Sequence, residues 1–183
     1  MDVTVKERKI SFASEYDITA NGATYYARKT IFAISDHLEI KNEGDRVIAT
    51  IQGFFSPIRG KHDFIMADGR TYHFQTEKLW KRTYSCVGPD GATYTLYQHR
   101  GRKCSIFLGD RQIAAFDKNL VVFGSGNEYD VRMDRDADLL VILCMVLTIN
   151  TEDYDDDGQN SVTVNFGSLG PQARTFDENW QPR

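Results

Sequence analysis

The sequence predicts a mostly β protein: a closed antiparallel barrel of about twelve strands around a buried central apolar α-helix. Three observations predict this fold class. Turn signals recur roughly every 8 to 12 residues as far as Met133, which is the spacing found in β-sandwiches and barrels. The stretches between the turns alternate apolar and polar residues, as half-buried strands do. A later stretch, residues 139–149 (LLVILCMVLTI), is apolar without alternation.

The composition predicts a single globular domain. The chain has 183 residues, is 41% hydrophobic and contains 11 Phe, 9 Tyr and 2 Trp, which excludes an intrinsically disordered chain. The formal net charge is −4, whereas a general nucleic-acid binder needs a strongly basic surface, so we expect no nucleic-acid partner. We expect residues 1–168 to form the barrel and residues 169–183 to form a polar tail.

Six turn signals separate the predicted strands, and Gly, Asn or Asp in each tolerates the positive φ of a tight hairpin. They are Asn21-Gly22, Glu43-Gly44-Asp45, Asp68-Gly69, Pro89-Asp90-Gly91, Arg100-Gly101 and Gly109-Asp110. Residues 37–41 and 46–51, for example, alternate on both sides of one turn and are expected to pair. Six hairpins require about a dozen strands, and closure into a barrel removes the edges that an open sheet would expose.

A helix is predicted over about residues 136–150. Asp136 and Asp138 lie in its expected first turn, where negative charge favours the helix dipole. Because the segment is apolar on every side, the helix must be buried all round. A buried strand is the alternative, and the length of the run argues against it. The eleven residues 139–149 would span roughly 16 Å as a helix, about half of a bilayer core, so we expect a core helix without membrane insertion.

An acidic loop, residues 151–160, and one more strand, residues 161–166, are expected after the helix. Residues 153–158 match the D-x-D-x-D-G start of a calcium-binding loop. Position 12 of such a loop would be Val164, where a bidentate Glu is needed. We therefore interpret this segment as a solvated loop and predict no metal site, with calcium binding as the alternative.

The chain resembles a known superfamily in several segments. Residues 5–12, 16–22 and 25–32 form an alternating opening hairpin, and Tyr129-Asp130-Val131 leads toward the apolar segment. Over about residues 3–150, the chain is similar to the tubby C-terminal-like superfamily, especially its branch of LURP-one-related proteins and phospholipid scramblases. The resemblance implies a closed barrel with the helix threaded through the middle. It also implies lipid as a ligand class, because tubby proteins bind phosphoinositides through a cationic pocket and scramblases are linked to calcium and lipid.

No catalytic motif is present, so we expect no enzyme and no cofactor. The histidines lie in separate predicted hairpins, and the chain contains neither His-Glu-x-x-His nor Gly-x-Ser-x-Gly.

Cys86, Cys104 and Cys144 are too widely spaced for a thiolate zinc site or a disulfide framework, which favours a reducing compartment. Charges in residues 1–9 predict no signal peptide. We therefore expect a cytoplasmic protein that associates peripherally with membranes.

The four histidines named above as members of separate predicted hairpins are His37, His62, His73 and His99.

Basic residues at the ends of hairpins form the candidate ligand-binding site. Trp80 beside them would suit contact with lipid headgroups. The alternative is that hairpin ends are charged because they are solvated and that Trp80 belongs to the core. A further cluster, residues 59–62, precedes these positions. The predicted site residues are Lys78, Lys81, Arg82, Arg100, Arg102 and Lys103.

These residues lead to three functional hypotheses. The first is a non-enzymatic module for anionic phospholipid or phosphoinositide at the cytoplasmic membrane surface. The second is a cytosolic protein-interaction or regulatory domain without lipid affinity, and the third is scramblase-like, calcium-dependent lipid transfer. Convergence of the cations on one surface would favour the first. The charge distribution permits it, because residues 134–157 carry −7 and the rest of the chain carries +3.

Overall fold

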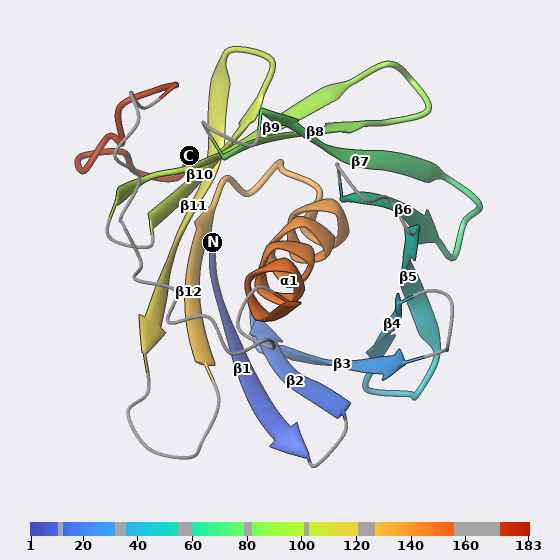
Figure 1. Ribbon diagram of the computed structural model, residues 1–183. Helices are drawn as coiled ribbons and strands as arrows, with labels where there is room; N and C mark the ends of the chain where they lie inside the picture. The colour runs from blue at the N-terminus through green and yellow to red at the C-terminus, as the bar shows by residue number, and fades with distance from the viewer. Residues whose placement is uncertain are drawn as a thin grey trace.

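The computed structural model describes residues 1–10, 13–31, 36–54, 60–78, 82–100, 103–120, 127–155 and 173–183. Within them the chain forms twelve β-strands and one α-helix (Figure 1). The elements are β1 (Asp2–Ile10), β2 (Ala13–Ala20), β3 (Ala23–Ile31), β4 (Asp36–Asn42), β5 (Val47–Phe54), β6 (Lys61–Met66), β7 (Thr71–Lys78), β8 (Thr83–Val87), β9 (Thr93–Gln98), β10 (Lys103–Leu108), β11 (Arg111–Leu120), β12 (Asn127–Met133) and α1 (Leu139–Asp155).

The strands form the predicted closed barrel. Each strand pairs in antiparallel fashion with the next along the chain, and β12 pairs with β1. The closing register places Val3 opposite Val131 and Val5 opposite Tyr129. All four side chains are buried, so the alternation seen in the sequence becomes one continuous inner face.

Tight turns occur at predicted glycines within the described residues. At the turn between β2 and β3, Asn21 and Gly22 both have positive φ, 49° and 78°, as a two-residue hairpin with the right-handed twist of the strands requires. Gly69, in the turn between β6 and β7, has a φ of 89°. The sequence therefore located these turns from the residue types that tolerate such backbone conformations.

The up-and-down topology gives the barrel two different rims. The entry rim carries the turns at residues 20–23, 42–47, 66–71, 87–93 and 108–111, and the chain passes from β12 into α1 at this end. The exit rim carries the other ends of the strands, where the connections between β1 and β2, β3 and β4, β5 and β6, β7 and β8, β9 and β10, and β11 and β12 leave the sheet. The helix begins at the entry rim and runs through the barrel toward the exit rim (Figure 1).

The central helix differs from its predicted range at both ends. It covers Leu139–Asp155, starting three residues later and ending five residues later than residues 136–150. The later start has a clear cause: Asp138 is the N-cap, and its Oδ1 accepts hydrogen bonds from the N–H of Leu140 (3.0 Å) and of Val141 (3.3 Å). The expectation of two aspartates in the first helical turn was therefore wrong, because both precede the helix.

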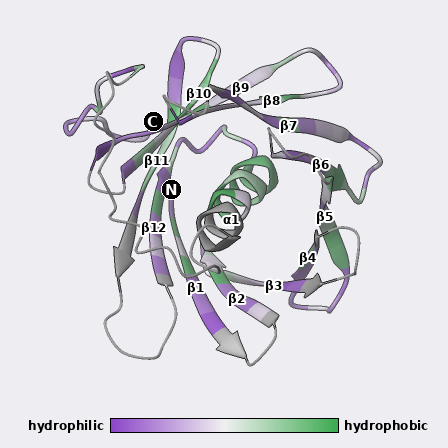
Figure 2. Ribbon diagram, in the orientation of Figure 1, coloured by the Kyte–Doolittle hydropathy of each residue, from purple (hydrophilic) through white to green (hydrophobic). Residues whose placement is uncertain are grey.

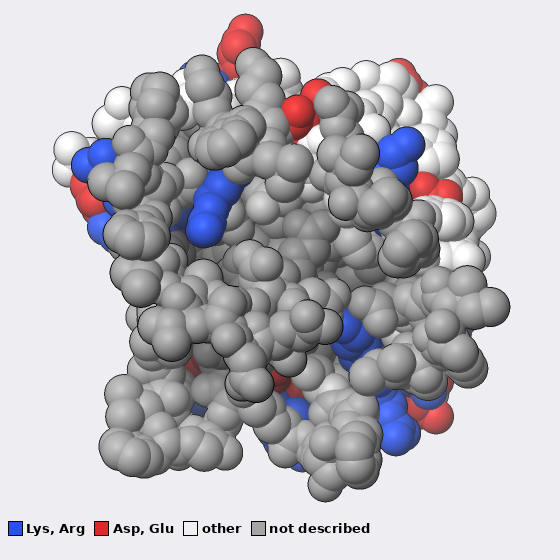
Figure 3. All heavy atoms as spheres, in the orientation of Figure 1, with Lys and Arg blue, Asp and Glu red and all other residues white. Residues whose placement is uncertain are grey.

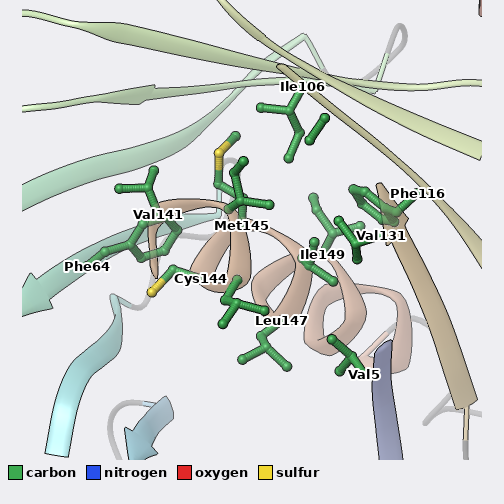
Figure 4. Close-up of a cluster of buried hydrophobic side chains, with 14 of the residues drawn as sticks. Val5, Phe64, Ile106, Phe116, Val131, Val141, Cys144, Met145, Leu147 and Ile149 are labelled. Carbon is green, nitrogen blue, oxygen red and sulfur yellow. The ribbon is translucent and has the colours of Figure 1, made fainter. Parts of the chain in front are cut away.

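The core is the contact between α1 and the inner face of the barrel. Every residue of α1 from Val141 to Leu147 is fully buried, which confirms the helix buried on all sides. Figure 4 shows Phe64 of β6, Ile106 of β10 and Val5 of β1 around this helix. The described part of α1 is mostly apolar in colour (Figure 2). Each large apolar side chain buried in this core stabilises the folded state by about 1.5 to 3 kcal/mol, because folding removes it from water.

Some sequence predictions fall outside the described residues. The predicted strand at residues 161–166, Trp80, and positions 156–158 of the calcium-loop pattern lie there. The first three positions of that pattern, residues 153–155, have helical backbone as the end of α1. In the part of the chain that the structure describes, no helix is long and apolar enough to cross a membrane.

Candidate functional site

Topology brings the strand ends that flank the three basic clusters to one end of the barrel. The connections between β5 and β6, β7 and β8, and β9 and β10 all leave from the exit rim, and these six strands are consecutive neighbours in the sheet. The sequence left open whether these clusters lie at the same end. The strand ends that flank them do, because alternate connections of an up-and-down barrel return to the same rim.

The predicted site residues occupy different environments at this rim. Arg82 and Arg100 are exposed. The backbone carbonyl of Arg82 accepts a hydrogen bond from the N–H of Gln98 at 3.1 Å, which fixes Arg82 beside the end of β9, two residues before Arg100. Lys103, at the start of β10, is half-buried. Lys78 ends β7, but its side chain, like the whole of Lys81 and Arg102, lies outside what the structure describes.

Phe54 is an exposed aromatic residue that the sequence analysis did not select. It ends β5 at the exit rim, has 46% of its surface exposed and pairs across the strands with the exposed Lys61. The alternating pattern of β5 contained a signal for it, since Gly53 is buried and the next residue must face outward. An exposed Phe beside Lys suits the boundary between water and lipid headgroups.

Three cations of the rim are available to an external anion. Among the described residues, none forms an ion pair with Lys61, Arg82 or Arg100. Figure 3 shows lysine and arginine atoms at several points of the face that it views. Uncompensated cations at the same rim attract phosphate or carboxylate groups.

The acidic residues around α1 lie at opposite ends of the barrel. Asp134, Asp136 and Asp138 precede the helix at the entry rim, whereas Glu152, Asp153 and Asp155 are in its last turns, toward the exit rim. No basic residue lies in the last turn of α1, so no cation within that turn offsets the negative end of the helix dipole. An external anion at the exit rim therefore meets cations on the strands and negative charge at the helix end.

The acidic residues at the entry rim have structural partners. Arg70 Nη1 lies 3.1 Å from Asp138 Oδ2 and donates a hydrogen bond to the Tyr72 hydroxyl at 2.8 Å. Arg111 binds Asp136 through both terminal nitrogens at 3.0 Å. The hydrogen bond to Asp68, followed by that to Asp138, raises the pKa of the Arg70 guanidinium. These ion pairs attach strand turns to the segment before α1.

Histidine and cysteine side chains form no metal centre within the residues that the structure describes, where no group of three or more His, Cys, Asp or Glu could hold an ion. The prediction of separate hairpins was wrong for His62 and His73, which lie on the paired strands β6 and β7 because both flank the turn at Gly69. His73 Nδ1 is 2.8 Å from Asp63 Oδ1. The three cysteines are buried and free, and burial raises the pKa of Cys86 to about 12, so this thiol stays protonated.

Residues 173–183 lie across the barrel wall, and we call this segment the strap. Lys103 Nζ donates to both carboxylate oxygens of Glu178, at 2.7 and 2.8 Å. The ring of Phe176 lies 5.1 Å from that of His99, and the guanidinium of Arg174 lies 3.9 Å above the ring of Phe107. The segment predicted as a polar tail thus contacts the site region directly.

The strap also reaches the segment between β12 and α1. The N–H of Arg183 donates to Asp134 Oδ1 at 2.8 Å, and the N–H of Arg135 donates to the carbonyl of Arg183 at 3.0 Å. Asp134 is almost fully buried, so this backbone hydrogen bond satisfies an oxygen that water does not reach. The strap therefore links the region of the exit rim to the entry rim.

Burial on β10 shows the effect of the strap. Cys104 and Ile106 face the core, as alternation predicts, so Ser105 and Phe107 face outward. Both are nevertheless buried, with 2% and 5% of their surface exposed. Arg174 packs on Phe107, and Phe176 packs on His99, whose Nε2 lies 2.7 Å from Ser105 Oγ. The outer wall here is thus a second, small core under the strap.

Comparison with known proteins gives one match. The model of the LURP-one-related family matches residues 1–150, which are most of the chain and include all twelve strands and most of α1. No curated protein and no solved structure matches the chain. The matched range ends before the strap.

Proposed function

Because this chain belongs to the LURP-one-related family, within the tubby-like superfamily, we propose that it is a non-enzymatic module that binds anionic phospholipid, in particular phosphoinositide, at its exit rim. The family suggests a tubby-like lipid-binding barrel. The observation that carries the proposal is that three exposed cations, Lys61, Arg82 and Arg100, lie at the same rim without ionic partners among the described residues.

The expected affinity is modest and depends on salt. A basic residue near an anionic leaflet contributes about 1 kcal/mol, so the three exposed cations together supply about 3 kcal/mol. Phe54 adds about 0.7 to 1.4 kcal/mol if its ring enters the headgroup region, because only 46% of its surface is still exposed. These sums support reversible peripheral association at the cytoplasmic surface of a membrane.

A protein partner is the second candidate. The negative end of the α1 dipole faces the same rim and opposes contact with an anionic bilayer. A protein surface of mixed charge would match the rim better. Scramblase-like, calcium-dependent lipid transfer has less support, because α1 is enclosed on all sides by the barrel and its apolar side chains are already buried.

Vesicle binding tests the proposal. We expect the protein to bind phosphatidylcholine vesicles that contain phosphatidylinositol bisphosphate at low salt, and not vesicles of phosphatidylcholine alone. The double substitution Arg82→Gln and Arg100→Gln should weaken binding about 30-fold, because it removes about 2 kcal/mol of electrostatic attraction. Cosedimentation over a range of lipid concentrations measures this change.

A matched control separates the rim from net charge. Arg46 and Arg135 are also exposed, and both belong to the entry rim. The double substitution Arg46→Gln and Arg135→Gln removes the same charge and should leave binding nearly unchanged. Equal losses in both variants, or no binding by the unaltered protein at low salt, would refute the proposed site.

A further inference from the structure

We propose that the strap is an intramolecular competitor for the ligand of the exit rim: Glu178 occupies Lys103, and an anionic headgroup gains that lysine only when the strap leaves. This inference rests on the proposed function. It adds a regulatory contact formed by residues beyond the range of the family match.

The geometry makes Glu178 a substitute for a phosphate. Both carboxylate oxygens lie within 2.8 Å of Lys103 Nζ, so one ammonium group binds two anionic oxygens, as it would with a phosphomonoester. Lys103 begins β10 at the exit rim. Arg100 lies in the connection between β9 and β10, which leads into Lys103. A headgroup held by Arg100 and Lys103 together would have to take the place of the Glu178 carboxylate.

The aromatic part of the strap supports this competition. The Phe176 ring lies 5.2 Å from Lys103 Nζ and packs against His99, so Phe176 holds the strap over the lysine. Displacement of Glu178 therefore also requires Phe176 to leave the outer wall. Glu178 and Phe176 therefore dock on Lys103 and its surroundings together, and they leave together.

Release of the strap is physically accessible. The side chain of Glu178 is 66% exposed, and exposed ion pairs of this kind are weak and screened by salt. Phe176 is only partly buried. The other contacts of the strap are the exposed Arg174 guanidinium above the Phe107 ring and the backbone hydrogen bonds of Arg183, which lie at the entry rim, away from Lys103. No element of the barrel has to open, because the strap lies outside the closed sheet.

Two substitutions test the competition by different routes. Glu178→Gln removes the competing charge, and Phe176→Ala keeps the charge but weakens docking. Each should tighten binding to phosphatidylinositol bisphosphate vesicles by up to about fivefold, the effect of one additional basic residue near the membrane. Lys103→Gln should abolish the gain when it is combined with either substitution.

Asp45→Asn is the matched control. Asp45 pairs with Lys41 at 3.0 Å in a turn of the entry rim, so its substitution also removes one negative charge and releases one lysine, but at the other end of the barrel. It should leave vesicle binding unchanged. In a Trp80→Phe background, fluorescence of Trp180, within the strap, should change when the protein binds vesicles and should already differ when Phe176→Ala is added, before lipid is present.

The outcomes distinguish the two proposals. If the unaltered protein binds vesicles and Glu178→Gln behaves like Asp45→Asn, competition by the strap is refuted and the lipid site stands. If Glu178→Gln tightens binding but Phe176→Ala does not, the effect is local charge repulsion and the competition is again refuted. If no variant binds vesicles, the proposed function itself fails, and the competition fails with it.

Discussion

His99 shows how a single buried side chain depends on the strap. Its Nε2 lies 2.7 Å from Ser105 Oγ, whereas its Nδ1 is buried without a well-formed hydrogen bond among the described residues. Burial lowers the pKa of His99 from its usual 6.5, and the nearby backbone carbonyl of Arg174 opposes the shift only in part. The structure around His99 therefore favours the neutral ring.

The lowered pKa predicts a loss of stability in acid. A histidine whose pKa is lower in the folded than in the unfolded state adds to the free energy of unfolding. This contribution is complete above about pH 6.5 and is lost as the pH falls through the folded pKa. The unfolding free energy should therefore fall between pH 7 and pH 5 by more in the unaltered protein than in His99→Gln, as measured by urea denaturation. Equal pH dependence in both proteins would contradict this role.

The charges around the ring determine how acid would act. His99 follows β9 in the chain, and Lys103 of β10 and Arg174 of the strap are both cations near its contacts, with Glu178 as the acid that pairs with Lys103. A protonated His99 would add positive charge where two cations already lie. Acid is therefore expected to loosen the strap before it affects the barrel.

At the level of elements, α1 determines whether the barrel has a core. Leu143 is fully buried in the middle of the helix. Leu143→Ala should lower the unfolding free energy by about 2 to 5 kcal/mol, because it leaves a cavity that the closed sheet cannot fill. Thermal and urea denaturation of the variant would measure the loss.

A charge at the same position should have a larger effect. Leu143→Asp buries a carboxylate without a partner among apolar side chains, so we expect it to prevent folding. As a control, a substitution of the exposed Ile65 to Asp on the outer face of β6 should be tolerated. A folded, stable Leu143→Asp protein would be inconsistent with a helix enclosed by the barrel.

At the level of the whole molecule, charge is separated by topology rather than by sequence distance. The acidic group before α1 is bound by arginines at the entry rim, while the negative end of the α1 dipole and the exposed cations Lys61, Arg82 and Arg100 share the exit rim. The net charge of −4 therefore says little about what either rim attracts. Local charge on one rim decides the sign of the interaction.

This separation predicts a salt dependence for the intact protein. Binding to phosphatidylinositol bisphosphate vesicles should weaken steeply as sodium chloride rises, because exposed cations at the exit rim are screened over about 8 Å at physiological ionic strength. A residual, salt-resistant component should disappear in Phe54→Ser, which removes the exposed ring. Cosedimentation at several salt concentrations gives both results. Binding that is insensitive to salt would contradict an electrostatic site at this rim.

The sequence by itself determined the barrel, the number of strands and the buried helix. Alternation, turn residues and one apolar run are local signals, and each follows from the requirement that apolar groups be buried and backbone groups be paired. The helix start was misplaced because the role of Asp138 as N-cap depends on which of three aspartates bonds the first N–H groups.

Only the tertiary structure decided which basic side chains are available to an external anion. The common rim of Lys61, Arg82 and Arg100 follows from the strand order of the closed sheet, and the pairing of Lys103 with Glu178 joins residues 75 positions apart. Lys103 and Arg100 look equivalent in the sequence, yet the strap binds only one of them among the described residues. Ion pairs form between neighbours in space, and chain folding alone determines who those neighbours are.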